Sequence, residues 1–281
     1  MNIKKQVIDQ IDDHHKSIGY GVDSKGYLKT PEENLIADFP NWEEIEREIK
    51  DGGGGELSKT DDGEPKFHAV HSSCALCVNN FAMVKYHKEN ISLFGSSAFK
   101  VAQFERKLKT GISTPNLDFY LRNDTSVIGI ESKFTEILKA EIDHTNENLD
   151  KYLVDKLKLP AGFNDIIEYY INCKEKLHLD AAQLLKHMMG MFNETAEVKA
   201  GAKLCLVYLY WIPANLKKDD PEFEIYQKHE EELKKFKEQI SGFSVKFEAY
   251  SYTDFWKTLE KNEELKTYVD KLRKRYLFDV N

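Results

Sequence analysis

The feature that most restricts the fold is the segment at residues 127–134, which reads VIGIESKF. Its first half is apolar enough for a buried strand, but it ends on Glu131 and Lys133, and charges are costly to bury unless they are paired or functional. Side chains alternate along a strand, so Glu131 and Lys133 share one face while Ser132 points to the other. The segment therefore predicts a buried strand that presents an acid and a lysine side by side.

Two further apolar segments precede this strand, at residues 98–104 and 117–121. The polar stretch at 122–126 has the composition of a tight turn, so the second and third strands should form a hairpin. Asp118 lies in the middle strand, from which its carboxylate can approach the face that carries Glu131. An acid, a second acid and a lysine are therefore expected to converge.

Two carboxylates that approach each other repel, and Mg²⁺, with oxygen ligands at about 2.0–2.1 Å, is a usual way to keep both ionised. Asp118 and Glu131 therefore predict a divalent metal site. A cation there would polarise a phosphoryl oxygen and activate water, and Lys133 would orient the nucleophile and stabilise the developing charge.

The rest of the chain predicts an α/β layer with a mixed sheet. Helical patterns are expected at 42–49, 73–84, 180–192, 220–239 and from Thr253 or Asp254, and strands at 203–212 and 243–252. Beyond residue 136 the pattern reads as helical, with a break at 160–162. Residues 1–66 read as an irregular, acidic N-terminal region with short helices, separate from a larger unit at 67–281. The four glycines at 52–55 indicate a flexible linker or loop. The alternative, a phosphate-binding loop, is disfavoured because the segment lacks the Gly-Lys-Ser/Thr ending of a P-loop.

Composition and charge exclude some classes of protein. The 281 residues are 41% hydrophobic and 31% charged, as in an ordinary folded protein. The net charge of −8 argues against a protein that coats nucleic acid through bulk positive charge, although residues 85–133 hold eight Lys or Arg against five Asp or Glu. No stretch approaches the roughly 20 apolar residues of a membrane span, and the first residues lack a signal-peptide pattern. We expect a cytoplasmic protein with no membrane contact, whose four cysteines are reduced.

The motif TPNLD at 114–118, twelve intervening residues and then ESK at 131–133 resembles the PD-(D/E)XK signature of restriction-endonuclease-like nucleases. The order of helix, three strands, helix and fourth strand over about residues 70–212 also resembles their core. With the segment IGIESKFTE and HSSCAL upstream, the chain is similar to a bacterial group of such proteins. The resemblance implies a restriction-endonuclease-like core, a central mixed sheet flanked by helices, with N-terminal and C-terminal additions. One departure is that Asn116 and Leu117 separate the proline from Asp118.

The resemblance implies particular roles for residues. Asp118 and Glu131 would be metal ligands together with the Ser132 carbonyl, and Lys133 would be the catalytic lysine. Members of the superfamily often supply a further acid from upstream, for which Glu105 is the candidate; a surface salt bridge is the alternative. Some carry, on the helix after the lysine strand, a catalytic glutamine that can hydrogen-bond the metal-bound water or DNA. That glutamine would be Gln183, one turn before His187 on the same helix face, although a plain polar face is equally consistent with the pair.

The function implied is endonucleolytic hydrolysis of DNA phosphodiester bonds with Mg²⁺, for which Mn²⁺ would substitute, in restriction or defence. A homodimer would allow both strands to be cut. The alternative is a noncatalytic module of the same fold that binds nucleic acid or forms a complex.

Two other patterns stay open. Cys74 and Cys77 have the spacing of a zinc half-site, but they fall within an apolar helix where cysteine is commonly a small buried hydrophobe. The cluster KLRKR at 271–275 has the charge to contact phosphate, and it is equally what the last turn of a helix prefers, since cations there complement the helix dipole.

Overall fold

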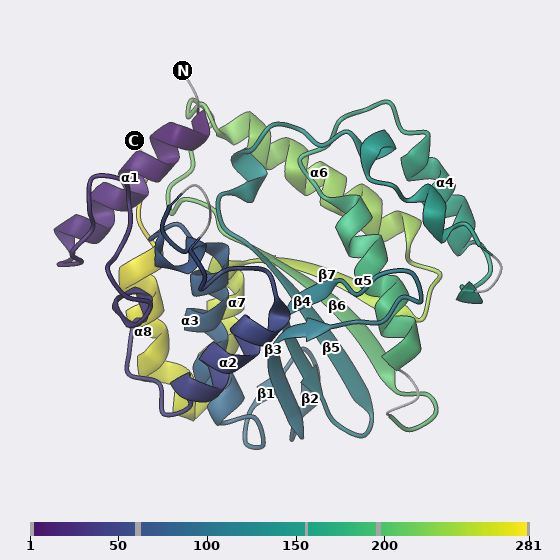
Figure 1. The fold of residues 1–281 in the computed structure, drawn as a ribbon, viewed down its shortest axis with the longest axis horizontal. Coiled ribbons are helices and arrows are strands. Elements are labelled where there is room, and N and C mark those ends of the chain that lie inside the picture. Colours follow the sequence, from purple (N-terminus) through teal and green to yellow (C-terminus); the bar gives the residue numbers. More distant parts are fainter. Residues whose placement is uncertain (1–2, 60–62, 155–156, 195–197, 280–281) are drawn as a thin grey trace.

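A computed structural model describes residues 3–59, 63–154, 157–194 and 198–279. Five strands form the central sheet in the order β3-β4-β5-β6-β7 (Figure 1). The first three are antiparallel neighbours, and the last two run parallel to β5. A short turn suffices for the antiparallel hairpin, whereas each parallel connection passes through helices. The expected mixed sheet is confirmed, with strands β3 (Val101–Lys107), β4 (Asn116–Arg122), β5 (Ser126–Lys133), β6 (Lys203–Tyr210) and β7 (Val245–Ser251).

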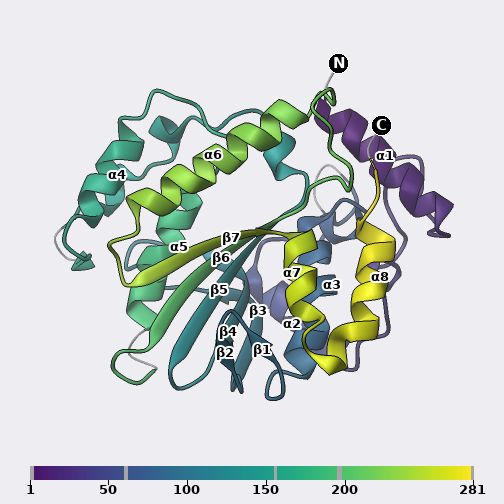
Figure 2. The ribbon, with the colours of Figure 1, turned by 180° about the vertical axis from the view of Figure 1, so that it is seen from behind.

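Helices cover both faces of the sheet, and Figures 1 and 2 show the two groups from opposite sides. One group comprises α4 (Phe163–Ile171), α5 (Ala181–Asn193) and α6 (Phe223–Gln239). The other comprises α3 (Ser73–Tyr86), α7 (Tyr252–Leu259) and α8 (Lys266–Tyr276). Because β5 lies between β4 and β6 and is covered on both faces, it is buried along its length up to Lys133.

Apolar contacts fix the helices against the sheet. The Phe81 ring of α3 stacks on Phe119 of β4, with centroids 4.7 Å apart, and on Phe255 of α7, at 5.1 Å. On the other face, α5 approaches the end of β3 at Gly190, where an added Cβ would lie 2.4 Å from Leu108 Cβ. This close approach holds α5 beside the strands that carry Asp118 and Glu131.

Side-chain caps set where the main helices begin. Ser72 accepts the Ala75 N–H before α3, Asp180 accepts the Gln183 N–H before α5, and Ser251 accepts the Asp254 N–H before α7. The Asp180 cap matters for the site, because it fixes the first turn of α5, from which Gln183 projects.

The edge strand β3 is covered by α2 (Trp42–Gly52). Glu48 of α2 accepts the Phe104 N–H at 2.9 Å and the ammonium of the buried Lys85 at 2.9 Å. These bonds satisfy a backbone donor of the edge strand and a buried cation at once. A short hairpin of β1 (Ser92–Leu93) and β2 (Ser96–Ser97) follows α3.

Three expectations from the sequence are wrong. The N-terminal region begins with a regular helix, α1 (Ile3–Ser17), because Val7, Ile11 and His15 recur every four residues and bury one side of it. Where the sequence reads as helical beyond residue 136, the described residues up to 154 hold only short 3-10 turns, at 136–138, 144–146 and 150–152. In place of the single expected C-terminal helix there are two helices, α7 and α8. The turn between them contains Asn262, whose Oδ1 accepts the Ser92 N–H. The division at residue 66 stays a prediction.

No described helix combines the length and the apolarity that crossing a bilayer requires.

Candidate active site

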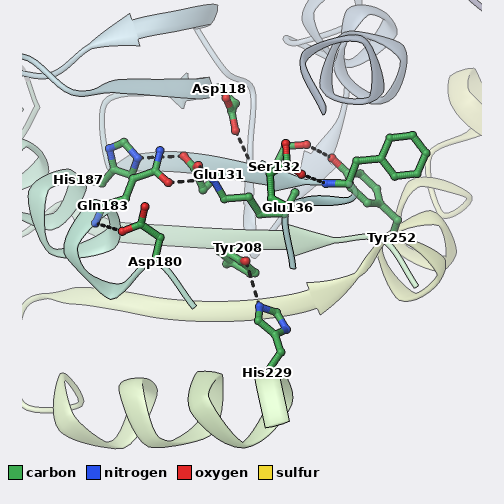
Figure 3. Close-up of polar contacts among 12 residues, drawn as sticks. Asp118, Glu131, Ser132, Glu136, Asp180, Gln183, His187, Tyr208, His229 and Tyr252 are labelled. Atoms are coloured by element: carbon green, nitrogen blue, oxygen red, sulfur yellow. Dashed lines mark hydrogen bonds and ion pairs between the residues drawn. The ribbon is translucent and has the colours of Figure 1, made fainter. Parts of the chain in front are cut away.

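The β4–β5 ladder does not extend to the first residues of β4 or to the last residues of β5. Phe119 and Ile130 form the last pair of the ladder toward this end. Beyond that pair, the Ser132 N–H of β5 donates to the Asp118 Oδ2 at 2.6 Å (Figure 3). This charge-assisted bond fixes the Asp118 carboxylate where the hairpin opens, so that it faces the end of β5.

Glu131 and Lys133 form a buried ion pair on one face of β5. The Lys133 Nζ lies 2.6 Å from Glu131 Oε1 and donates to Gln183 Oε1 at 2.8 Å. The other oxygen of Glu131, Oε2, lies 2.9 Å from His187 Nε2. Figure 3 shows Glu131, Gln183 and His187 meeting between β5 and α5. Both oxygens of Glu131 therefore have partners, and the lysine is held in one place.

Gln183 and His187 reach the site because they lie one turn apart on α5. The spacing indicated a shared face, and the structure turns that face toward β5. His187 is fully buried. The structure thus brings Asp118, Glu131, Lys133 and Gln183 together, and it adds His187 as a direct neighbour of Glu131.

Ser132 points to the opposite face, as the alternation of a strand requires. Its hydroxyl lies 2.6 Å from the hydroxyl of Tyr252, the first residue of α7. Tyr252 was not singled out from the sequence, in which no pattern connects it to β5. The role of the Ser132 carbonyl as a metal ligand stays a prediction.

Glu105 of β3 lies opposite Asp118 of β4, but the two residues do not form a pair of the β3–β4 ladder. The β3–β4 register pairs Phe104 with Phe119 and Arg106 with Leu117, which leaves Glu105 and Asp118 unpaired across from each other. Glu105 has a left-handed backbone, with φ of 50°, a conformation that non-glycine residues rarely adopt. Local backbone strain of this kind is often found at functional sites.

The glycines at 52–54 line one side of this site. Gly52 ends α2, and an added Cβ there would lie 2.6 Å from Glu105 Cβ. Asn116 bridges the two, donating through Nδ2 to the Gly52 carbonyl at 2.8 Å and to Glu105 Oε2 at 3.1 Å. The sequence predicted a flexible linker or loop at residues 52–55. Residues 53–55 do leave the helix as a turn, but the prediction is wrong for Gly52, which belongs to α2 and packs against Glu105.

A cavity of about 560 Å³ opens at this point. Residues from α2, β3, β4 and α5 line it: Gly52, Gly53, Gly54, Glu56, Glu105, Lys107, Thr114, Pro115, Asn116, Asp118, Gln183 and His187. Such a cavity is large enough for a phosphate and an attached sugar.

The carboxylates of the site differ in their electrostatics. Burial raises the pKa of Glu131, but the Lys133 charge and then His187 outweigh burial and hold this pKa low, at about 2. Burial lowers the pKa of Lys133, and Glu131 reverses that effect and raises it. Glu131 and Lys133 are therefore both charged and largely neutralise each other.

Asp118 and Glu105 lack such compensation. Burial, followed by the charges of Glu131 and Glu105, raises the pKa of Asp118 well above its usual range. Burial, followed by the charges of Glu56 and Glu131, raises the pKa of Glu105 to about 7 against the lowering effect of Asn116. Without a cation, both carboxyl groups are therefore shifted toward their protonated forms, because burial and the neighbouring acids outweigh the effect of the lysines nearby.

A divalent cation fits this donor set, because the groups with raised pKa values are carboxylates, which hard cations prefer. In the described ranges, however, no three His, Cys, Asp or Glu side chains are arranged as a ready-made metal site. Cys74 and Cys77 are buried and free in α3, and burial raises the pKa of both thiols, which opposes the thiolate form that zinc binds.

The mixed sheet flanked by helices defines a restriction-endonuclease-like protein. The model of the family described as "Restriction Endonuclease associating with ARP" matches residues 10–277, so the chain belongs to this family. No curated protein and no solved structure matches the chain.

Replacing Gly52 by alanine should disturb the site through Glu105. The added Cβ would force Glu105 to move, and we expect the free energy of unfolding to fall by about 1–3 kcal/mol, as in other overpacked positions. Urea denaturation measures this change. Gly54→Ala is the matched control, because the nearest atom to its added Cβ is 3.9 Å away. Equal stability of the two variants would contradict the packing described.

Glu105 should make the metal-free protein less stable as the pH rises. Its folded-state pKa of about 7 lies above its ordinary value of 4.5, so the stability it contributes is complete below pH 4.5 and is lost as the pH rises to 7. Glu105→Gln should therefore be more stable than the wild type by about 1–3 kcal/mol at pH 8, with no difference near pH 4.

Urea denaturation in EDTA at the two pH values measures this effect. The exposed Glu264→Gln serves as control and should follow the wild type at both pH values. A Glu105→Gln variant that is no more stable than the wild type at pH 8 would show that Glu105 is not buried beside other acids.

Proposed function

We propose that the chain is a metal-dependent endonuclease that hydrolyses DNA phosphodiester bonds, with a site of the PD-(D/E)XK type. The observation that carries the proposal is the meeting of Asp118, Glu131 and Lys133 where the β4–β5 hairpin opens. A buried ion pair beside further acids is costly to maintain, and perturbed carboxylates in a cavity are typical of catalytic sites. Membership in a restriction endonuclease family supports DNA as the substrate and restriction or defence as the setting.

We assign to Lys133 the stabilisation of the negative charge that develops on the phosphoryl group in the transition state. Its ammonium has three donors, and among the described residues Glu131 and Gln183 accept two of them, which leaves one for the attacking water or a phosphoryl oxygen. Because Glu131 keeps Lys133 protonated, the charge is already in place when the substrate arrives.

Asp118 and Glu131 would hold Mg²⁺, with Glu105 and the Ser132 carbonyl as further ligands. When bound, the cation would supply Lewis-acid polarisation of the scissile phosphate and an activated water. Mn²⁺ shares the preference for oxygen ligands and should substitute. The raised pKa values of Asp118 and Glu105 support this assignment, since a cation would relieve the repulsion that each of them has with Glu131.

Gln183 and His187 would act by positioning. Gln183 orients Lys133, and His187 orients Glu131 from the same helix face. The cleavage of both strands of a duplex would need two such sites, so we expect a homodimer with two-fold symmetry.

Replacing Lys133 by methionine should lower the rate of DNA cleavage by at least about 100-fold, in line with the loss of one preorganised charge-stabilising donor. The assay compares supercoiled plasmid, linear duplex and single-stranded DNA with Mg²⁺, Mn²⁺ or EDTA. Lys257→Met, an exposed lysine on α7, is the matched control and should cut at the wild-type rate. Circular dichroism checks that both variants are folded.

Cleavage that persists in EDTA, or at the wild-type rate in Lys133→Met, would contradict the proposed mechanism. If the folded wild type cuts none of the substrates but binds DNA, the noncatalytic module of the same fold becomes the better description.

A further inference from the structure

A second cavity, of about 400 Å³, lies away from the acidic site, between the segment that follows α1 and the last turns of α8. Figure 1 shows α1 and α8 side by side at the edge of the molecule. The lining contains three cations and no acid: Ile18, Gly19, Tyr20, Ile36, Lys271, Lys274 and Arg275. This cavity therefore has the opposite charge from the active site.

The unusual member is Arg275, which is only 1% exposed. Its Nη2 donates to Asn34 Oδ1, and its guanidinium carbon lies 4.2 Å from the centroid of the Tyr20 ring. Nε and Nη1 have no hydrogen-bond partner in the part of the chain that the structure describes. Buried arginines are normally paired with an anion, so this one carries an uncompensated positive charge against the cavity.

Lys271 and Lys274 add exposed charge at the mouth of the cavity. They lie one turn apart on α8, on the helix face that also carries Arg275. Within the described ranges, no carboxylate comes within ion-pair distance of Lys271, Lys274 or Arg275, whereas the neighbouring Arg273 pairs with Glu260 and Asp270. Glu260 and Asp270 thus neutralise Arg273, which does not line the cavity, and the three cations that line it have no acidic partner among the described residues.

We propose that this cavity binds a phosphoryl group. The two exposed lysines make the direct contacts, and the buried Arg275 strengthens the positive potential behind them, because a charge in a low-dielectric region is weakly screened. A phosphoryl group is the anion that best fits two lysines and an arginine, since it offers several strong acceptor oxygens and up to two negative charges. The cavity has room for the phosphate and a sugar attached to it. This site does not depend on the proposed nuclease activity.

The phosphoryl group has two sources to be distinguished, a nucleic acid backbone and a free phosphate or nucleotide. The test compares the wild type with Lys271→Gln/Lys274→Gln. Lys257→Gln/Lys266→Gln is the matched control, because it removes two exposed lysines that lie outside the cavity. All four substitutions are at exposed positions, and thermal unfolding in sodium chloride checks the fold.

The first measurement is thermal unfolding in sodium phosphate and in sodium chloride at equal ionic strength. A ligand that binds only the folded state raises the melting temperature. The second is fluorescence anisotropy of labelled duplex DNA in EDTA over a range of salt concentrations. The loss of two phosphate contacts should reduce the slope of log affinity against log salt by about two.

If only the cavity variant loses salt slope, the site binds the nucleic acid backbone. If only the cavity variant loses stabilisation by phosphate, and its DNA slope matches that of the control, the site binds free phosphate or a nucleotide. A cavity variant that equals the control in both measurements would overturn the proposal.

Discussion

The ion pair between Lys133 and Glu131 is the interaction on which the rest of the structure depends. It lies at the end of β5, a strand enclosed by β4, β6 and helices on both faces. Removing two charges from water costs several kcal/mol for each ion, and this cost is offset only when further hydrogen bonds complete the pair. Gln183 and His187 provide those bonds, which explains why α5 must pack closely on the sheet at Gly190.

The same arrangement divides the acids of the site into two kinds. Glu131 is stabilised as an anion by Lys133, whereas burial and the charge of Glu131 raise the pKa values of Asp118 and Glu105. The left-handed backbone of Glu105 adds local strain. Such a site costs stability in the free protein, as is common where function requires a preorganised charge distribution.

Local patterns were sufficient to predict much of this geometry. The turn at 122–126 sets the register of the hairpin and hence places Asp118 near Glu131, while strand alternation separates Glu131 and Lys133 from Ser132. The four-residue spacing on a helix was enough to place Gln183 with His187.

Features that depend on distant segments were not predictable in the same way. The glycines at 52–55 have the composition of a flexible linker or loop. Only the packing of Gly52 against Glu105 of β3 shows that Gly52 lines the site. The helix α1 has few apolar residues, so its pattern is weak until its partners are known. The pairing of Ser132 with Tyr252 joins residues 120 positions apart.

The central claim is that Asp118 and its neighbouring carboxylates hold a divalent cation. Isothermal titration calorimetry with Mn²⁺ at pH 7.5, in the absence of DNA, tests this claim without relying on catalysis. The wild type should bind Mn²⁺, and Asp118→Asn, checked for folding by circular dichroism, should bind it at least about tenfold more weakly. Wild-type protein that binds no Mn²⁺, or an Asp118→Asn variant that binds it as tightly, would show that these carboxylates do not hold the cation.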